Sequence, residues 1–154
     1  MKQRWLPVGV FAGVLFAVNI VARLVVRLAA GEDDGKQIWI GLVALVAVAL
    51  VTLVAAVRWA PRYPMPRVVG DLVLGVLAGC LLSTLIGPFI SRGEAFGGGF
   101  GYFLAQLFYY LMICALGAFF GVLAVMAFGR DYKSRGWQRF AQTVQAKPHR
   151  VGRR

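Results

Sequence analysis

The sequence contains few of the residues that carry most enzyme chemistry. Its 154 residues include two cysteines, one histidine and six acidic residues. Cys80 and Cys114 do not form a C-x-x-C motif, and the single histidine, His149, cannot complete a zinc site or ligate haem within an apolar segment. No nucleophile–histidine–acid set and no paired carboxylates suited to acid–base catalysis are present. The sequence therefore predicts a protein that is not an enzyme and that holds no metal or cofactor.

Acidic residues are also greatly outnumbered by basic ones. Six Asp and Glu residues stand against 17 Lys and Arg, which gives a formal net charge of +11, and 60% of the chain is hydrophobic. Typical soluble domains contain about 45–50% apolar residues, so a soluble domain of this length cannot bury this much apolar surface. The charges lie mostly outside four long apolar runs, which indicates a polytopic membrane protein. The abundance of Ala, Val, Gly and Arg is typical of a GC-rich bacterial genome.

Each of the four apolar runs is long enough to cross a bilayer, which takes about 20 residues in an α-helix. They cover residues 6–28, 38–57, 68–90 and 102–128. The first run is longer than the apolar part of a signal peptide, about 7–15 residues, so we expect it to remain uncleaved. The sequence predicts an all-α fold in which residues 1–129 form a four-helix transmembrane bundle and residues 130–154 form a basic tail.

The distribution of basic residues predicts the orientation of these spans. Lys2 and Arg4 precede the first span, three arginines and no acid lie between the second and third, and eight Lys and Arg lie in the tail. The first connection is acidic and the third is nearly neutral. Basic loops stay in the cytoplasm, so both termini are predicted to be cytoplasmic in the cell (plasma) membrane.

The tail contains a short amphipathic segment at about residues 134–146. Its apolar residues follow the i, i+3, i+4, i+7 spacing of a helix face: Trp137, Phe140, Ala141 and Val144. We expect this helix to lie on the inner leaflet, with its basic residues toward anionic lipids. The tail is short and has no nucleic-acid-binding module, so no nucleic-acid partner is expected.

Asn19, Arg23 and Arg27 form the first candidate site. Their spacing of four residues puts them on one helical face, near the outer end of the first span. One interpretation is that the arginines extend to water and meet lipid phosphate or the acidic loop of Glu32, Asp33 and Asp34. The other is that they form a cationic stripe that faces the bundle and binds an anionic group from the outer side. The sequence alone leaves both interpretations open.

Small residues at four-residue spacing form a second pattern. They are Gly75, Gly79, Ser83 and Gly87 in the third span and Gly117 and Gly121 in the fourth, and Gly9, Gly13 and Ala17 repeat the spacing in the first. Such rows allow two helix backbones to approach closely in a membrane. We expect the third and fourth spans to make the tight contact, with the first span beside them. One of the rows would instead face another subunit if the protein works in a complex.

Arg67 and Asp71 lie four residues apart at the cytoplasmic end of the third span. A local ion pair is the simpler interpretation. The alternative is a carboxylate that couples to protons or cations, but no second acid or histidine in the spans would relay to it.

The sequence features together predict a non-catalytic integral membrane protein. We expect an accessory, assembly or scaffolding subunit of a larger inner-membrane complex, which contacts other membrane subunits or copies of itself. The alternative is a small oligomeric transporter or channel subunit with a cationic site near the outer face. A lipid-modifying membrane enzyme is a third hypothesis, for which the sequence offers no identifiable catalytic residue.

Overall fold

The computed structural model describes residues 2–30, 33–91 and 99–145, and within these ranges the chain is helical with no strand. The elements are α1 (Lys2–Val25), the π-helical turn η1 (Val26–Ala30), α2 (Asp34–Trp59), α3 (Met65–Ser91), α4 (Gly99–Ala127) and α5 (Tyr132–Gln145). The all-α prediction is confirmed for this part of the chain. So is the prediction of four helices that are long and apolar enough to cross a membrane. Glu32, most of the third connection and the end of the tail with His149 lie outside the described residues.

All four long helices begin before the apolar run that they contain, and the starts of α2 and α3 show how. At the start of α2, the side chain of Asp33 accepts a hydrogen bond of 3.2 Å from the backbone N–H of Lys36 and so caps the helix. At the start of α3, Pro66 lies in the first turn, where its missing N–H does not interrupt the helix. The cap of α2 and the tolerated proline in the first turn of α3 therefore let these two helices begin before their apolar runs.

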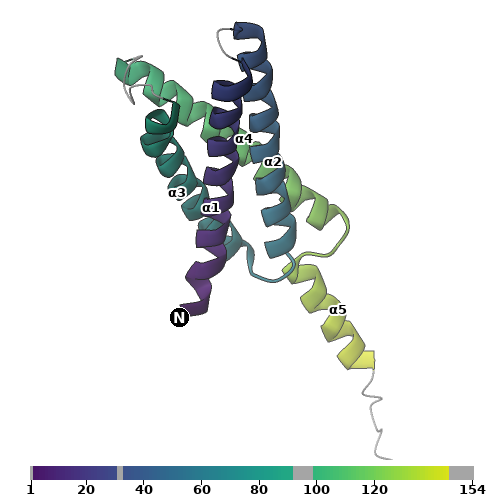
Figure 1. Ribbon diagram of the computed structural model, residues 1–154. Helices are drawn as coiled ribbons and strands as arrows, with labels where there is room; N and C mark the ends of the chain where they lie inside the picture. The colour runs from purple at the N-terminus through teal and green to yellow at the C-terminus, as the bar shows by residue number, and fades with distance from the viewer. Residues whose placement is uncertain (1, 31–32, 92–98, 146–154) are drawn as a thin grey trace, which may run out of the picture.

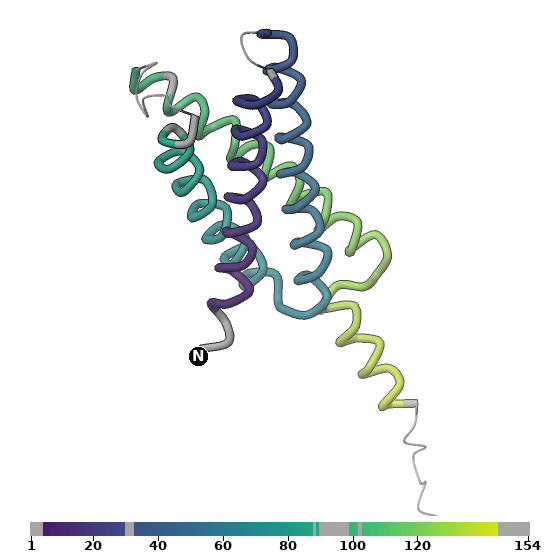
Figure 2. Tube along the Cα trace, viewed as in Figure 1, coloured from purple at the N-terminus to yellow at the C-terminus, as the bar shows by residue number. Residues whose placement is uncertain are grey.

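The four long helices pack in two closely associated pairs. Figure 1 shows α1 and α2 side by side, with α4 crossing behind them and α3 on the other side of α1. The most extensive contacts are those of α1 with α3 and of α2 with α4. The tube in Figure 2 shows that η1 and the start of α2 lie at one end of the molecule, while the N-terminus and α5 lie at the other.

The glycine row of α3 lies against α1. A Cβ added to Gly75 would overlap the ring of Phe11, and one added to Gly79 would come within 3.1 Å of Leu15 Cβ. These two glycines therefore provide the space that large side chains of α1 fill.

The glycine row of α4 lies against α2. A Cβ added to Gly117 would overlap the carbonyl oxygen of Ala49, and one added to Gly121 would lie 2.6 Å from the carbonyl oxygen of Leu53. Here the two helix backbones themselves come close.

The prediction that the third and fourth spans make the tight contact is wrong, because α3 pairs with α1 and α4 with α2. A row of small residues defines a flat helix face, but it does not specify which helix covers that face. The coverings differ: α1 fills the α3 row with Phe11 and Leu15, whereas α2 brings its backbone and the small Ala56 to the α4 row.

The buried core lies where these two pairs meet. Its largest fully buried side chains are Leu15, Val48, Val68, Thr52, Cys80 and Cys114. Both cysteines are free thiols, and both belong to this one cluster. Thiols in such a position act as small packing residues.

The short helix α5 is attached to the four-helix part of the molecule at its first residue. The backbone N–H of Tyr132 donates a hydrogen bond of 3.2 Å to the carbonyl oxygen of Ala60, in the connection between α2 and α3. Beyond this point α5 extends away from the other helices (Figure 1). Its apolar side chains Trp137, Phe140 and Val144 are exposed.

Candidate binding cleft

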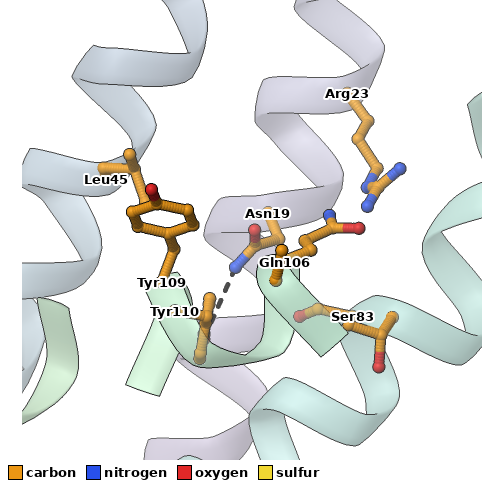
Figure 3. Close-up of a pocket in the computed structure, with 9 residues that line it drawn as sticks. Asn19, Arg23, Leu45, Ser83, Gln106, Tyr109 and Tyr110 are labelled. Carbon is orange, nitrogen blue, oxygen red and sulfur yellow. Dashed lines mark hydrogen bonds between the residues drawn. The ribbon is translucent and has the colours of Figure 1, made fainter. Parts of the chain in front are cut away.

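Polar side chains of α1, α3 and α4 line a cleft in the half of the molecule that contains η1. Its cavity of about 410 Å³ is lined by Asn19, Arg23, Leu45, Ser83, Thr84, Ala105, Gln106, Tyr109 and Tyr110. A second cavity of about 530 Å³ shares Asn19, Arg23, Leu45 and Gln106 with the first. The two cavities therefore form one cleft, to which all four long helices contribute. Figure 3 shows the polar side chains that converge on it.

Asn19 links α1 to α4 at the base of the cleft. Its Nδ2 donates a hydrogen bond of 3.0 Å to the carbonyl oxygen of Leu15 and a longer one, of 3.5 Å, to the hydroxyl of Tyr110 (Figure 3). Tyr110 is buried, with 7% of its surface exposed. The asparagine therefore satisfies a buried hydroxyl on the neighbouring helix, which fixes its own orientation.

Arg23 lies against α3. A Cβ added to Gly87 would come within 2.5 Å of the Arg23 Nε atom and 2.7 Å of its Cζ atom, so the guanidinium occupies the space that this glycine leaves open. In Figure 3 the side chains of Arg23 and Gln106 point toward one another. The arginine is thus directed toward neighbouring helices, the arrangement that the second interpretation of the sequence requires.

Ser83 and Thr84 line the cleft on the α3 side. The hydroxyl of Ser83 donates a 2.7 Å hydrogen bond to the carbonyl oxygen of Gly79, and that of Thr84 donates a 2.8 Å hydrogen bond to the carbonyl oxygen of Cys80. A hydroxyl has one hydrogen, which these bonds use, so both oxygens can only accept further hydrogen bonds. The side-chain donors of the lining are on Asn19, Arg23, Gln106, Tyr109 and Tyr110.

The lining of the cleft has a positive charge. Arginine is always protonated in proteins, and the lining of the two cavities, within the part of the chain that the structure describes, includes Arg23 but no Asp or Glu. A guanidinium has five N–H donors in a planar fork that matches the oxygens of carboxylate and phosphate groups. The cleft therefore has the chemistry of a site for a small oxyanion.

Arg27 lies apart from this cleft. It belongs to η1, it is exposed, and it lines neither of the two cavities. The prediction of one shared face for Asn19, Arg23 and Arg27 assumes 3.6 residues per turn throughout. A π-helical turn closes its hydrogen bonds from i to i+5, so the α-helical spacing does not hold through η1.

The pair predicted at the start of α3 forms a separate arrangement. Arg67 Nε lies 3.7 Å from Asp71 Oδ2, and the guanidinium stacks 4.3 Å from the centre of the Tyr63 ring. The Nε atom is buried and has no hydrogen-bond partner among the described residues. The geometry is that of a local ion pair supported by a cation–π contact.

No group of three or more His, Cys, Asp or Glu side chains comes together within residues 2–30, 33–91 and 99–145.

Tyr109 and Tyr110 are lining residues that the sequence analysis missed. Together with Gln106 they stand at i, i+3 and i+4 in α4. This spacing puts polar groups on one side of an otherwise apolar helix. The two tyrosines could have been predicted as lining residues from this pattern. The contact of Gly87 with Arg23 was missed as well, because the spacing of glycines does not show which side chain fills the space.

A second hollow is almost entirely apolar. A groove of about 630 Å³ runs between α1 and α2, and its walls include Val14, Ala17, Val21, Trp39 and Val43. Among the described residues of its lining, Trp39 alone has a polar side-chain group.

The chain matches no protein-family profile, no curated protein and no solved structure. The polar cleft and the uncovered faces of the helices are the features of the molecule that bear on its function.

Proposed function

We propose that the protein inserts into the inner membrane as a four-helix bundle with both termini in the cytoplasm. The four long apolar helices support insertion. The N-terminus and α5 lie at the same end of the molecule (Figure 1), and the hydrogen bond from Tyr132 to Ala60 brings the α2–α3 connection to that end. These are the three basic segments of the sequence, and basic segments remain in the cytoplasm.

In this orientation α5 lies at the inner leaflet. Its exposed apolar residues include Trp137 and Phe140, while Lys133, Arg135 and Arg139 carry positive charge. An amphipathic helix of this composition binds anionic lipid surfaces through both its apolar face and its cations.

Within the membrane, the protein acts as a non-catalytic accessory, assembly or scaffolding subunit of a larger complex. The observation that carries this proposal is the uncovered row of small residues on α1. A Cβ added to Gly9 or Gly13 would meet nothing within 4 Å, and Ala17 continues the row on an exposed face. By contrast, Gly75 and Gly117 lie in tight contacts with neighbouring helices. A glycine in a helix costs about 1 kcal/mol relative to alanine, so a glycine row without a contact inside the chain favours a contact outside it.

The apolar groove between α1 and α2 continues this surface. Ala17 belongs both to the small-residue row and to the wall of the groove, and Val21 continues the same face one turn later. A transmembrane helix of a partner subunit that packs on Gly9, Gly13 and Ala17 would extend into the groove. The uncovered row and the groove form one surface, which we call the α1 face.

The proposal is tested by purifying the protein in mild detergent through an N-terminal tag and weighing it by native mass spectrometry. We expect a stoichiometric complex with another membrane protein, and the mass of that protein identifies the partner. Gly13→Leu places a large side chain on the α1 face without an intramolecular clash, because nothing lies within 4 Å. It is expected to reduce the recovered partner severalfold.

The matched control is Gly101→Leu, on α4, where an added Cβ also meets nothing within 4 Å. This variant should retain the partner. A lone monomer, or equal loss of the partner in both variants, contradicts the assignment of the α1 face as the contact surface.

The polar cleft favours a second candidate function, a small oligomeric transporter or channel subunit. Arg23, in a cleft whose described lining has no acidic residue, would bind an anion on its path. Under this hypothesis native mass spectrometry shows a closed homo-oligomer. Arg23→Ala then abolishes anion flux into proteoliposomes, whereas an accessory subunit shows no flux to lose.

A further inference from the structure

The placement of Arg23 leads to an inference beyond the proposed function. We propose that the polar cleft is a binding site for a phosphate-type oxyanion, with the guanidinium of Arg23 as its charged contact. The oxyanion comes either from the headgroup of an anionic phospholipid or from a free ion in solution. The inference holds whether or not a partner covers the α1 face, because the two surfaces share only the wall residues Ala22 and Ala44 between α1 and α2.

The direction in which Arg23 points supports this site. An arginine near the end of a membrane-spanning helix normally extends to the aqueous boundary, because its charge is costly in hydrocarbon. Arg23 instead lies with its guanidinium against Gly87 of α3, and points toward Gln106 of α4 (Figure 3). An arginine that merely reaches for water needs no glycine on a neighbouring helix. The contact with Gly87 therefore indicates a cleft built around the guanidinium.

Donor groups near the guanidinium support the same site. The amide of Gln106 lies in the same lining and faces Arg23 (Figure 3), and the described residues of that lining include no carboxylate. A guanidinium has five N–H donors, so a contact with the protein leaves donors for a ligand. Hydrogen bonds from a charged donor to an oxyanion are about twice as strong as those between neutral groups.

The cleft is also large enough for such a ligand. The two cavities that share Arg23 and Gln106 measure about 410 and 530 Å³. Small-molecule sites in proteins typically occupy about 300–1,000 Å³, so each cavity has room for a phosphate and part of what it is attached to. Polar groups lie on the α1, α3 and α4 sides of the cleft, so a ligand there is bound by several helices at once.

The test measures lipid retention by native mass spectrometry of the full-length protein in an uncharged detergent. Phosphatidylglycerol is titrated against phosphatidylcholine with the same acyl chains. We expect wild type to retain phosphatidylglycerol, and Arg23→Gln to bind it roughly tenfold to a hundredfold more weakly, the effect of losing one charged hydrogen bond. Arg27→Gln removes the same charge one turn further along, outside the cleft, and should change the affinity less than about twofold.

A second pair of variants tests the geometry while leaving every charge in place. Gly87→Ala puts a methyl group where the guanidinium lies and should weaken retention severalfold. Gly70→Ala, on the same helix, meets nothing within 4 Å and should have no effect. Arg23→Lys keeps the charge without the planar fork, so its affinity should fall between those of wild type and Arg23→Gln. These variants decide the question if Arg23→Gln fails to fold.

Inorganic phosphate, added at millimolar concentration, distinguishes the two sources of the ligand. Retention that depends on Arg23 and resists phosphate supports a lipid headgroup. Displacement of the lipid by phosphate, with phosphate binding that Arg23→Gln abolishes, supports a free oxyanion. Equal effects of Arg23→Gln and Arg27→Gln, or no effect of either, would overturn the proposal.

Discussion

Gly117 is the residue at which α4 approaches the backbone of α2. A Cβ at this position would overlap the carbonyl oxygen of Ala49 and lie 2.7 Å from Thr52 Oγ1. Neither neighbour is free to move away. The Ala49 oxygen belongs to the backbone, and the Thr52 hydroxyl is held by hydrogen bonds of 2.6 Å to Val48 and 3.0 Å to Ala49. The contact therefore requires a residue without a side chain.

We expect Gly117→Ala to destabilise the protein by about 1–3 kcal/mol, the usual cost of adding a methyl group to a packed contact. Thermal unfolding in detergent, followed by circular dichroism, measures the change. Gly101→Ala is the control on the same helix, because an added Cβ there meets nothing within 4 Å. It should leave the midpoint unchanged or raise it by the equivalent of roughly 1 kcal/mol at most. An equal decrease in both variants would mean that the contact with α2 is not what constrains Gly117.

At the scale of the element, α5 depends on a cap at its first turn. The backbone N–H of Ser134 donates a 3.3 Å hydrogen bond to Asp131 Oδ2, which lies just before the helix. Hydrogen bonds from Ser134 lower the pKa of Asp131 below its ordinary value of 3.8. Because the pKa is lowered, the charged carboxylate stabilises the start of α5 at every pH above the ordinary pKa of 3.8. The stabilisation is lost as the pH falls through the lowered pKa.

This cap predicts how the helicity of α5 depends on pH. Amide chemical shifts of residues 132–136 should stay helical from pH 7 down to pH of about 4, and lose helicity only below it. Asp131→Asn keeps a capping oxygen and should remove the pH dependence, while Asp131→Ala should reduce helicity at every pH. A transition near pH 6 in the wild type would show that another group controls this turn.

Elements also mark the boundary between what the sequence predicts and what it leaves open. The four long helices follow from the length and apolar character of their runs, which need no knowledge of neighbours. The partners of these helices do not follow. Gly75 and Gly117 are equally visible as small residues, but one meets an aromatic ring and the other a backbone carbonyl.

In the candidate cleft, too, the sequence predicts single residues but not how they come together. Asn19 and Arg23 are recognisable because polar residues are rare in apolar runs, and Gln106 stands out for the same reason. Their convergence depends on how α3 and α4 are placed around α1, which no local pattern encodes. Arg27 illustrates a further limit: its sequence spacing is helical, but the turn that carries it is a π-helix. A π-helical turn forms when the backbone at the end of an α-helix makes i to i+5 hydrogen bonds, and the spacing of side chains does not show this.

At the scale of the whole molecule, the basic and the acidic segments lie at opposite ends of the long helices. The end with the N-terminus and α5 carries the basic segments, and the end at which η1 leads to α2 carries Asp33 and Asp34. The polar cleft lies in the half near the acidic end. If the basic end faces the cytoplasm, the cleft lies in the outer half of the membrane, where it is accessible to outer-leaflet headgroups and external ions.

Cysteine labelling in bacterial cells measures this orientation. The native thiols should not react, because Cys80 and Cys114 have 0% and 1% of their surface exposed. Unsubstituted protein therefore gives the background of the assay. We expect Asp34→Cys to react with a membrane-impermeant maleimide on intact cells, and Gln142→Cys to react only in inverted vesicles. Both substitutions leave every Lys and Arg in place, and these residues set the topology. The opposite labelling pattern would put α5 outside the cell and the cleft in the cytoplasmic half. The oxyanion bound near Arg23 would then come from the inner leaflet or the cytoplasm.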